Sequence, residues 1–329
     1  MNWTGKTVLV TGAGGFIGSH LAERLTESGA RVRAMVHYNS GGSAGWLNES
    51  SLRPQMDVVA RDVRDAGAVL DAMKGCDTVF HLAALIAIPY SYVAPASYIQ
   101  TNVAGTLNVL EAARTLNTQR VIHTSTSEVY GTALEVPISE THSLQGQSPY
   151  SASKIGADKL AESYYRSFDT PVTTVRPFNT FGPRQSTRAV LPTIITQCLQ
   201  PDTKTIRLGS LTPTRDLNYV ANTVHGFIRA AESPETVGRT VNIGSGREIS
   251  IGDLAETIVR IVGRRISIEC DAQRIRPEKS EVERLLADNT LAKELIGWQP
   301  LFTLEEGLEL TIDWFRENLS RYRHDAYSI

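Results

Sequence analysis

Short runs of β-branched and apolar residues recur along the first half of the chain. They cover residues 7–10, 31–36, 56–60, 77–83, 119–125 and 171–177. Between them, segments such as 19–29 and 97–116 carry apolar residues at the three-to-four-residue spacing of amphipathic helices. Strands that alternate with helices in this way are typical of βαβ units. The pattern therefore predicts an α/β fold, a doubly wound parallel sheet with helices on both faces.

The pattern becomes irregular after Pro177. Helical spacing returns at 191–199, 221–233, 251–263 and 304–318, and a short strand is predicted at 240–245. We expect a larger domain over residues 1–178, to which 216–243 returns. Residues 179–215 and 244–329 are expected to form a smaller C-terminal domain.

Charge and hydropathy exclude several classes of protein. The 33 basic and 35 acidic residues give a net charge of −2, so a nucleic-acid-binding or membrane-binding surface is not expected. The longest apolar stretch, 79–90, contains a histidine and is too short to span a bilayer. The first residues lack the pattern of a signal peptide, which predicts a cytoplasmic protein. The histidines and cysteines show no metal-ligand spacing, so no metal site is predicted.

A glycine-rich loop follows the first predicted strand. Gly12, Gly15 and Gly18, with Phe16 and Ile17 between them, stand where that strand passes into a helix. Glycines there permit a sharp turn and let the backbone approach a pyrophosphate at the helix N-terminus. The sequence thus predicts a Rossmann-type fold that binds a dinucleotide.

The residues after the second strand leave the choice of dinucleotide open. NAD sites usually carry an acidic residue there for the ribose diol, but this chain has His37, Asn39 and Ser40. NAD is predicted and NADP is not excluded. Asp62 and Val63 would meet the adenine, although an Asp in a surface turn is an equal alternative. The end of the fourth strand would add further cofactor contacts from Leu82, Ala83 and Ala84.

A second cluster of residues carries acid–base chemistry. Tyr150 and Lys154 lie four apart on a predicted helix, so both side chains project from one face. An ammonium beside a phenol favours the phenolate and should lower the tyrosine pKa. A predicted strand ends at Thr126, Ser127 and Glu128, at the edge where doubly wound sheets place ligands. Glu128 could serve as a second acid–base group, or it could cap a helix or be solvated.

Together, TGAGGFIG, HLAA, TSTSEVYG, YSASK and RPFNTFGPRQ resemble the extended short-chain dehydrogenase/reductase family over essentially the whole chain. The chain looks most like nucleotide-sugar 4,6-dehydratases. The stretches around residues 81–110 and 181–197 are similar to those of enzymes acting on nucleotide-linked N-acetylhexosamines in legionaminic-type (nonulosonic) acid pathways.

The resemblance implies a redox-neutral reaction with a tightly bound cofactor. Tyr150 would take the proton of the sugar C4 hydroxyl while a hydride passes to the nicotinamide, and Lys154 would hold the cofactor ribose. Glu128 would remove the C5 proton and help water leave from C6, after which the hydride returns to C6. Thr126 would hold the C4 oxygen. The product would be a 4-keto-6-deoxy sugar.

The resemblance also implies a substrate site and an assembly. Asn179, Arg188, Arg215 and Arg276 match family positions that contact the nucleotide diphosphate of a UDP- or GDP-linked sugar. Guanidinium groups suit a pyrophosphate because they offer planar, bidentate donors. The smaller domain would then bind the nucleotide sugar. The family forms homodimers through helices corresponding to residues 97–116 and 150–168, which predicts a homodimer here.

Several functions remain open at this point. Many glucose-type dehydratases have Thr-Asp-Glu where this chain has Thr126-Ser127-Glu128. The serine form resembles GDP-mannose 4,6-dehydratases and also UDP-glucuronate decarboxylases. A UDP-sugar 4-epimerase would share Tyr150 and Lys154 but has no use for a carboxylate at Glu128. A dinucleotide-sensing regulator without turnover is the non-enzyme alternative.

Overall fold

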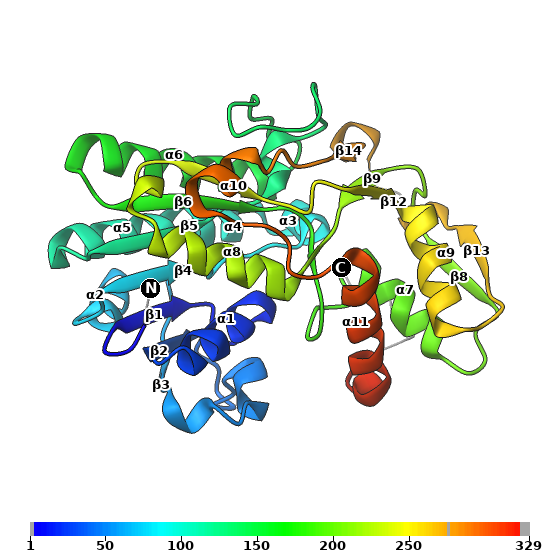
Figure 1. Ribbon diagram of the computed structural model, residues 1–329, viewed down its shortest axis with the longest axis horizontal. Helices are drawn as coiled ribbons and strands as arrows, with labels where there is room; N and C mark the ends of the chain where they lie inside the picture. Colours follow the sequence, from blue (N-terminus) through cyan, green and yellow to red (C-terminus); the bar gives the residue numbers. More distant parts are fainter. Residues whose placement is uncertain (1–2, 275–276, 323–329) are drawn as a thin grey trace.

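The computed structural model describes residues 3–274 and 277–322 (Figure 1). Its strands are β1(Thr7–Thr11), β2(Arg31–Val36), β3(Asp57–Ala60), β4(Thr78–His81), β5(Arg120–Thr124), β6(Val172–Pro177), β7(Thr180–Phe181), β8(Thr205–Leu208), β9(Thr214–Asp216), β10(Asn218–Tyr219), β11(Thr240–Ile243), β12(Glu248–Ser250), β13(Ser267–Cys270) and β14(Arg284–Leu285). The α-helices are α1(Phe16–Glu27), α2(Ala66–Met73), α3(Ile88–Val93), α4(Pro95–Tyr98), α5(Gly105–Leu116), α6(Pro149–Phe168), α7(Val190–Leu199), α8(Val220–Glu232), α9(Ile251–Val262), α10(Thr290–Ile296) and α11(Leu304–Asn318).

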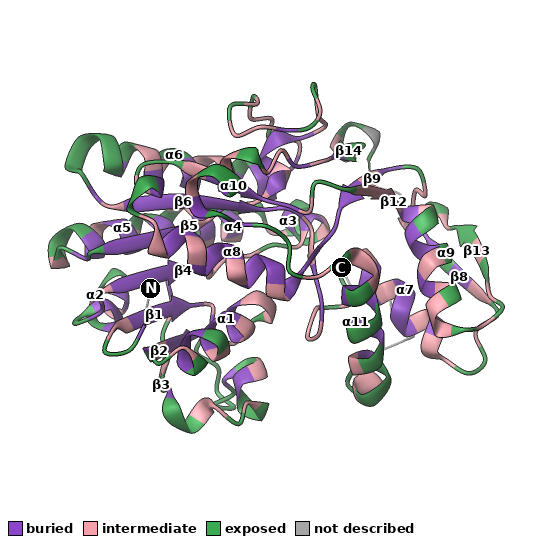
Figure 2. Cartoon of the chain, in the orientation of Figure 1, coloured by how far each residue is buried: buried purple, intermediate pink, exposed green. Residues whose placement is uncertain are grey.

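Seven of these strands form one parallel sheet in the order β11-β6-β5-β4-β1-β2-β3. Successive side chains of β1 enter different cores, because neighbouring residues of a strand point to opposite faces. Val8 and Val10 join a core with α1 and α8, whereas Leu9 joins a core with α2, α5 and α6. Burial on both faces explains why the strands are continuous apolar runs in the sequence (Figure 2). The predicted doubly wound, Rossmann-type sheet is confirmed.

The segment after β6 forms a second group of elements, beside the large sheet in Figure 1. There β8 pairs with β13, β9 lies between β12 and β14, and α7 contacts α9 and α11. The chain returns to the large sheet through α8 and β11, which pairs with β6. Helix α10 also packs against β11 and α8. The division into a dinucleotide-binding and a sugar-binding domain stays a proposal, in which 290–296 would belong with the sheet.

None of the helices within the described ranges combines the length and apolarity that crossing a membrane requires.

Candidate active site

The glycine loop follows β1 and lies against the backbone that follows β4. Gly12 has a φ of +70°, and a Cβ there would stand 2.9 Å from the Ala83 backbone nitrogen. The Thr11 hydroxyl accepts hydrogen bonds of 3.1 Å from the backbone N–H groups of Leu82 and Ala83. It therefore donates its own proton to His81 Nδ1, 2.9 Å away. These contacts join the two strand ends that a dinucleotide would cross.

The third glycine allows the loop to meet the first helix. A Cβ on Gly18 would lie 2.2 Å from the carbonyl oxygen of Gly12, and a Cβ on Gly15 would lie 3.2 Å from it. Helix α1 begins at Phe16 without a side-chain cap, so the backbone N–H groups of its first turn remain available to an anion. Phe16 and Ile17 are partly buried against the core. The glycine loop and the uncapped start of α1 together fit the pyrophosphate of a dinucleotide.

For Gly18→Ala we expect at least about a hundredfold weaker NAD binding and a lower melting temperature, because the added Cβ forces the Gly12 carbonyl out of place. Calorimetric titration with NAD and thermal melts would measure both. Gly67→Ala is the matched control, since its Cβ would meet only the Asp65 side chain, at 3.4 Å. A Gly18→Ala protein that binds NAD like the wild type contradicts this account of the loop.

The residues predicted to choose the dinucleotide lie at the ends of β2 and β3. His37, Asn39 and Ser40 are exposed, and Asn39 bridges its own loop by exchanging hydrogen bonds with Ser43. Asp62 accepts from the backbone and guanidinium of Arg64, and this partner lowers the pKa of the carboxyl. The contacts of Asp62 in this structure are therefore those expected of an aspartate in a surface turn.

Val63 and the residues after β4 are less exposed than the residues after β2. Val63 is buried against Gly105 of α5 and accepts a hydrogen bond from Asn108 through its carbonyl oxygen. Leu82, Ala83 and Ala84 are partly buried. Their assignment to the cofactor stays a prediction.

The predicted catalytic residues come together between β5 and α6. Thr126 caps the 3₁₀ helix Ser127–Tyr130, with its hydroxyl accepting from the Glu128 backbone N–H at 3.2 Å. Helix α6 starts at a capping box formed by Ser148 and Ser151, which places Tyr150 in its first turn. Ser127 is buried, and one Glu128 carboxylate oxygen is buried without a hydrogen-bond partner among the described residues. Glu128 as a whole is partly exposed, and Thr126 rather than Glu128 caps the 3₁₀ helix.

Burial decides the protonation of the Tyr150–Lys154 pair. Burial raises the pKa of Tyr150, and the negative charge of Glu128 raises it further. A hydrogen bond with the Thr126 side chain acts in the opposite direction and lowers this pKa. Burial lowers the pKa of Lys154 to about 8. The Lys154 ammonium donates to the Thr124 carbonyl oxygen at 2.6 Å. The predicted lowering of the tyrosine pKa by lysine is wrong for this arrangement, because burial raises this pKa and the neighbouring charges of Glu128 and Asp158 raise it further.

Sequence reasoning missed the residues that support this pair. The Tyr98 ring packs edge-on against Tyr150, with centroids 6.1 Å apart. Asn102, in the π-helical segment Ile99–Ala104, donates to the Ser153 hydroxyl and accepts from the Leu85 backbone. Asp158 is a buried carboxylate one turn beyond Lys154. A signal was available for Asp158, because residues 150, 154 and 158 share one helical face.

The predicted nucleotide-binding residues that the structure describes lie on different segments, after β6, before α7 and on β9. Asn179 has a buried, unpaired side-chain oxygen, considering the described part of the chain. Arg188 is exposed, and its positive charge acts to lower the pKa of Tyr98. Arg215 is buried on β9 and pairs with Glu281 at 3.1 Å. Arg276 lies outside the described residues.

A glycine cradle at the sheet's carboxyl edge, followed by a Thr, a Glu, a Tyr and a Lys at one site, defines a Rossmann-type enzyme of the nucleotide-sugar dehydratase and epimerase class. The family model described as GDP-mannose 4,6 dehydratase matches residues 9–311, and the chain belongs to this family.

Its relatives catalyse different reactions. UDP-glucose 4-epimerase of Mycolicibacterium smegmatis is 34% identical over 94% of this chain and 98% of that protein. UDP-glucuronic acid decarboxylase 2 of Arabidopsis thaliana is 32% identical over 96% of this chain and 69% of that protein. The structure of dTDP-glucose 4,6-dehydratase from Streptomyces venezuelae, solved with NAD bound, superposes with a TM-score of 0.85 at 28% identity, covering 96% of this chain and 98% of that one.

Proposed function

We propose that this protein is a 4,6-dehydratase of a UDP- or GDP-linked sugar, with an N-acetylhexosamine of the legionaminic-type pathways as its substrate. The observation that carries the proposal is the carboxylate oxygen of Glu128, which is buried close to Tyr150 and has no hydrogen-bond partner within residues 3–274 and 277–322. A 4-epimerase needs only the Tyr and Lys, whereas a dehydratase needs a further acid–base group at C5 and C6. Burial of an unsatisfied carboxylate oxygen is costly, so a functional partner accounts for it.

Each group of the site has a role in this reaction. NAD, held by the glycine cradle and Lys154, supplies the reversible oxidation at C4 and the reduction at C6. As a phenolate, Tyr150 accepts the proton of the C4 hydroxyl, whose oxygen Thr126 holds. Because burial raises the pKa of Tyr150, this form requires a neighbouring positive charge. The C4 ketone acidifies the C5–H bond, and Glu128 removes that proton and delivers one to the departing C6 hydroxyl. The elimination returns Glu128 to its carboxylate form, so one carboxyl group serves both steps. Reduction at C6 then requires one proton at C5, which balances the proton that Tyr150 took from the C4 hydroxyl, so the complete cycle leaves both residues as they began.

The rest of the proposal follows the family. Asn179, Arg188, Arg215 and Arg276 would bind the nucleotide diphosphate. Exposed apolar residues on α5 and α6, including Leu107, Tyr165 and Phe168, would be covered in a homodimer.

We expect the purified protein, without added cofactor, to convert UDP-GlcNAc or GDP-GlcNAc to a product lighter by one water. Mass spectrometry of the reaction, with UDP-glucuronate as a third substrate, would identify the nucleotide and the reaction. An unchanged mass with inversion at C4 would make the protein an epimerase. Loss of carbon dioxide from UDP-glucuronate would make it a decarboxylase.

A further inference from the structure

Asp158 is a buried carboxylate that no step above uses. Its Oδ1 accepts from His123 Nε2 at 3.0 Å, and its Oδ2 accepts from the Ser125 hydroxyl at 2.6 Å. Arg176 donates to the same Oδ2 through Nε at 3.1 Å and Nη2 at 3.0 Å. Donors from β6 and from the end of β5 thus converge on one side chain of α6. Such charge-assisted bonds are strong and hold both partners in position.

Three consecutive residues at the end of β5 are joined to three successive turns of α6. The Thr124 carbonyl accepts from Lys154, the Ser125 hydroxyl donates to Asp158, and the Thr126 side chain bonds with Tyr150. The middle connection is the only one of the three that involves neither Tyr150 nor Lys154. It therefore connects the same two segments without using either of these residues.

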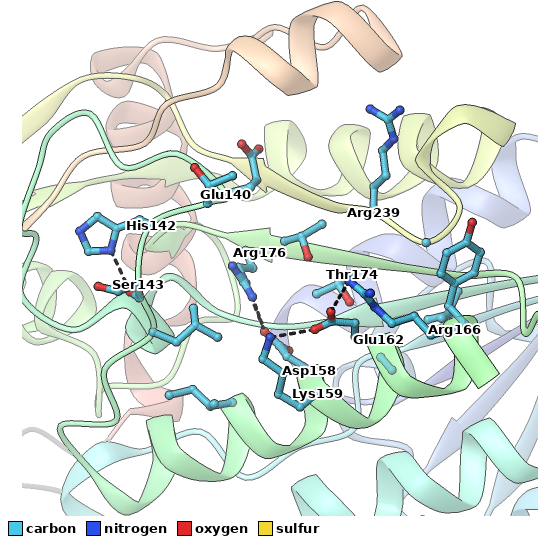
Figure 3. Close-up of a pocket in the computed structure, with 18 residues that line it drawn as sticks. Glu140, His142, Ser143, Asp158, Lys159, Glu162, Arg166, Thr174, Arg176 and Arg239 are labelled. Carbon is cyan, nitrogen blue, oxygen red and sulfur yellow. Dashed lines mark hydrogen bonds and ion pairs between the residues drawn. The ribbon is translucent and has the colours of Figure 1, made fainter. Parts of the chain in front are cut away.

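Asp158 and Arg176 also line a cavity of about 540 Å³ between α6, β6 and the start of β11. Figure 3 shows Arg176 extending from β6 toward Asp158, with Lys159 and Glu162 farther along the same helix. Arg176 donates in addition to the Tyr130 hydroxyl at 2.9 Å. The guanidinium is thereby held on two sides, by the carboxylate of Asp158 and by the hydroxyl of Tyr130.

Several charged and titratable groups interact with this carboxylate or with the residues that contact it. They are Lys154 on α6, His123 on β5, Arg176 on β6, His81 on β4, Glu128 and Tyr130 on the 3₁₀ helix, Tyr150 at the start of α6, and Glu140 in the loop before it. Burial lowers the pKa of His123, whose Nδ1 has no partner in the described structure, so His123 is neutral. Among these groups, Asp158 is the anion that supports the charge of Lys154.

We propose that Asp158 is a positioning residue that places a buried negative charge one helical turn from Lys154 and holds the end of β5 in register with α6. The proposal rests on the proposed use of Tyr150 and Lys154, which all the alternative reactions share. It assigns no contact with substrate to Asp158.

The protonation states agree with this role. Burial tends to raise the pKa of Asp158, but the hydrogen bond from His123 and the charges of Arg176 and Lys154 outweigh it and lower this pKa to about 2. Asp158 is therefore charged at neutral pH. Burial lowers the pKa of Lys154 to about 8, and Asp158 opposes that decrease. Without the carboxylate, Lys154 would lose its proton at a lower pH.

The test is the pH dependence of kcat/KM in Asp158→Asn, Asp158→Glu and Ser125→Ala, measured between about pH 6 and pH 10 on the reaction that the wild type catalyses. For Asp158→Asn we expect the alkaline limb, the pH at which kcat/KM falls on the basic side of the profile, to shift to lower pH by at least about one unit. We expect kcat at pH 8 to fall at least about tenfold and KM to stay unchanged. Asp158→Glu keeps the charge and should restore the limb. Ser125→Ala removes only the register contact and should lower kcat without moving the limb.

Removal of the carboxylate leaves Arg176 buried without its counterion, which could prevent folding. The double variant Asp158→Asn/Arg176→Met removes both charges and gives the same measurement in a folded protein. An alkaline limb that stays in place in Asp158→Asn and in Asp158→Asn/Arg176→Met overturns the proposal. The pH profile is measured on the reaction that the wild type catalyses, whatever that reaction is. Failure of the dehydratase assignment is therefore detected separately, because the wild-type protein would then release no water from the sugar.

Discussion

Tyr150→Phe is expected to lower the rate of water loss by about 10²–10⁴-fold and to leave no C4 ketone detectable. The phenol hydroxyl lies beside Thr126 and Glu128, and the ring packs on Tyr98, so removing one oxygen deletes the proton acceptor and keeps the packing. The C4 ketone can be measured by quenching an enzyme-excess reaction with borodeuteride, which labels the ketosugar at C4.

Tyr164→Phe is the matched control for this prediction. It removes a hydroxyl from the same helix, at a position where the phenol contacts Glu111 rather than the site. Both variants should melt close to the wild type. A Tyr150→Phe protein that still forms the ketone would show that another group accepts the C4 proton.

Glu128→Gln is expected to reduce water loss by a similar factor, about 10²–10⁴-fold, but to act at a later point. The amide has the shape of the carboxylate and cannot take the C5 proton, so the C4 ketone should accumulate and exchange of C5–H with deuterated solvent should stop. Borodeuteride labelling and mass spectrometry measure both effects on one sample.

The two variants together test the assignment of the reaction. Glu135→Gln, at an exposed position before α6, is the control and should retain the wild-type rate. Ketone without water loss in Glu128→Gln, and neither in Tyr150→Phe, is the expected pair of results. A Glu128→Gln protein with full turnover would favour the epimerase, which needs no carboxylate there.

The local patterns of the sequence were sufficient for the fold and for part of the site. The runs at 7–10, 31–36 and 171–177 became β1, β2 and β6 because a parallel sheet buried on both faces requires continuous apolar strands. The helix at 304–318 has the predicted bounds, since its capping box at Thr303 is local chemistry. Tyr150 and Lys154 share a face because four residues make about one helical turn.

Other features could not be obtained in this way. β9 is three residues long and acquires its structure from pairing with β12 and β14, which lie far away in the sequence. The prediction that Lys154 lowers the pKa of Tyr150 was wrong, because it counted one charge and omitted burial. The spacing rule alone also could not reveal that Asp158 meets His123, Ser125 and Arg176.

By itself, the sequence determined the strands of the parallel sheet, the glycine loop and the helical face that carries Tyr150 and Lys154, because each of these can be identified from a pattern of residues close in the chain. The tertiary structure alone decided the environment of those residues: the unpaired oxygen of Glu128, the protonation of Tyr150 and the four bonds on Asp158. The physical reason is that desolvation and charge pairing depend on which distant strands and helices exclude water from a group, and no local pattern encodes that exclusion.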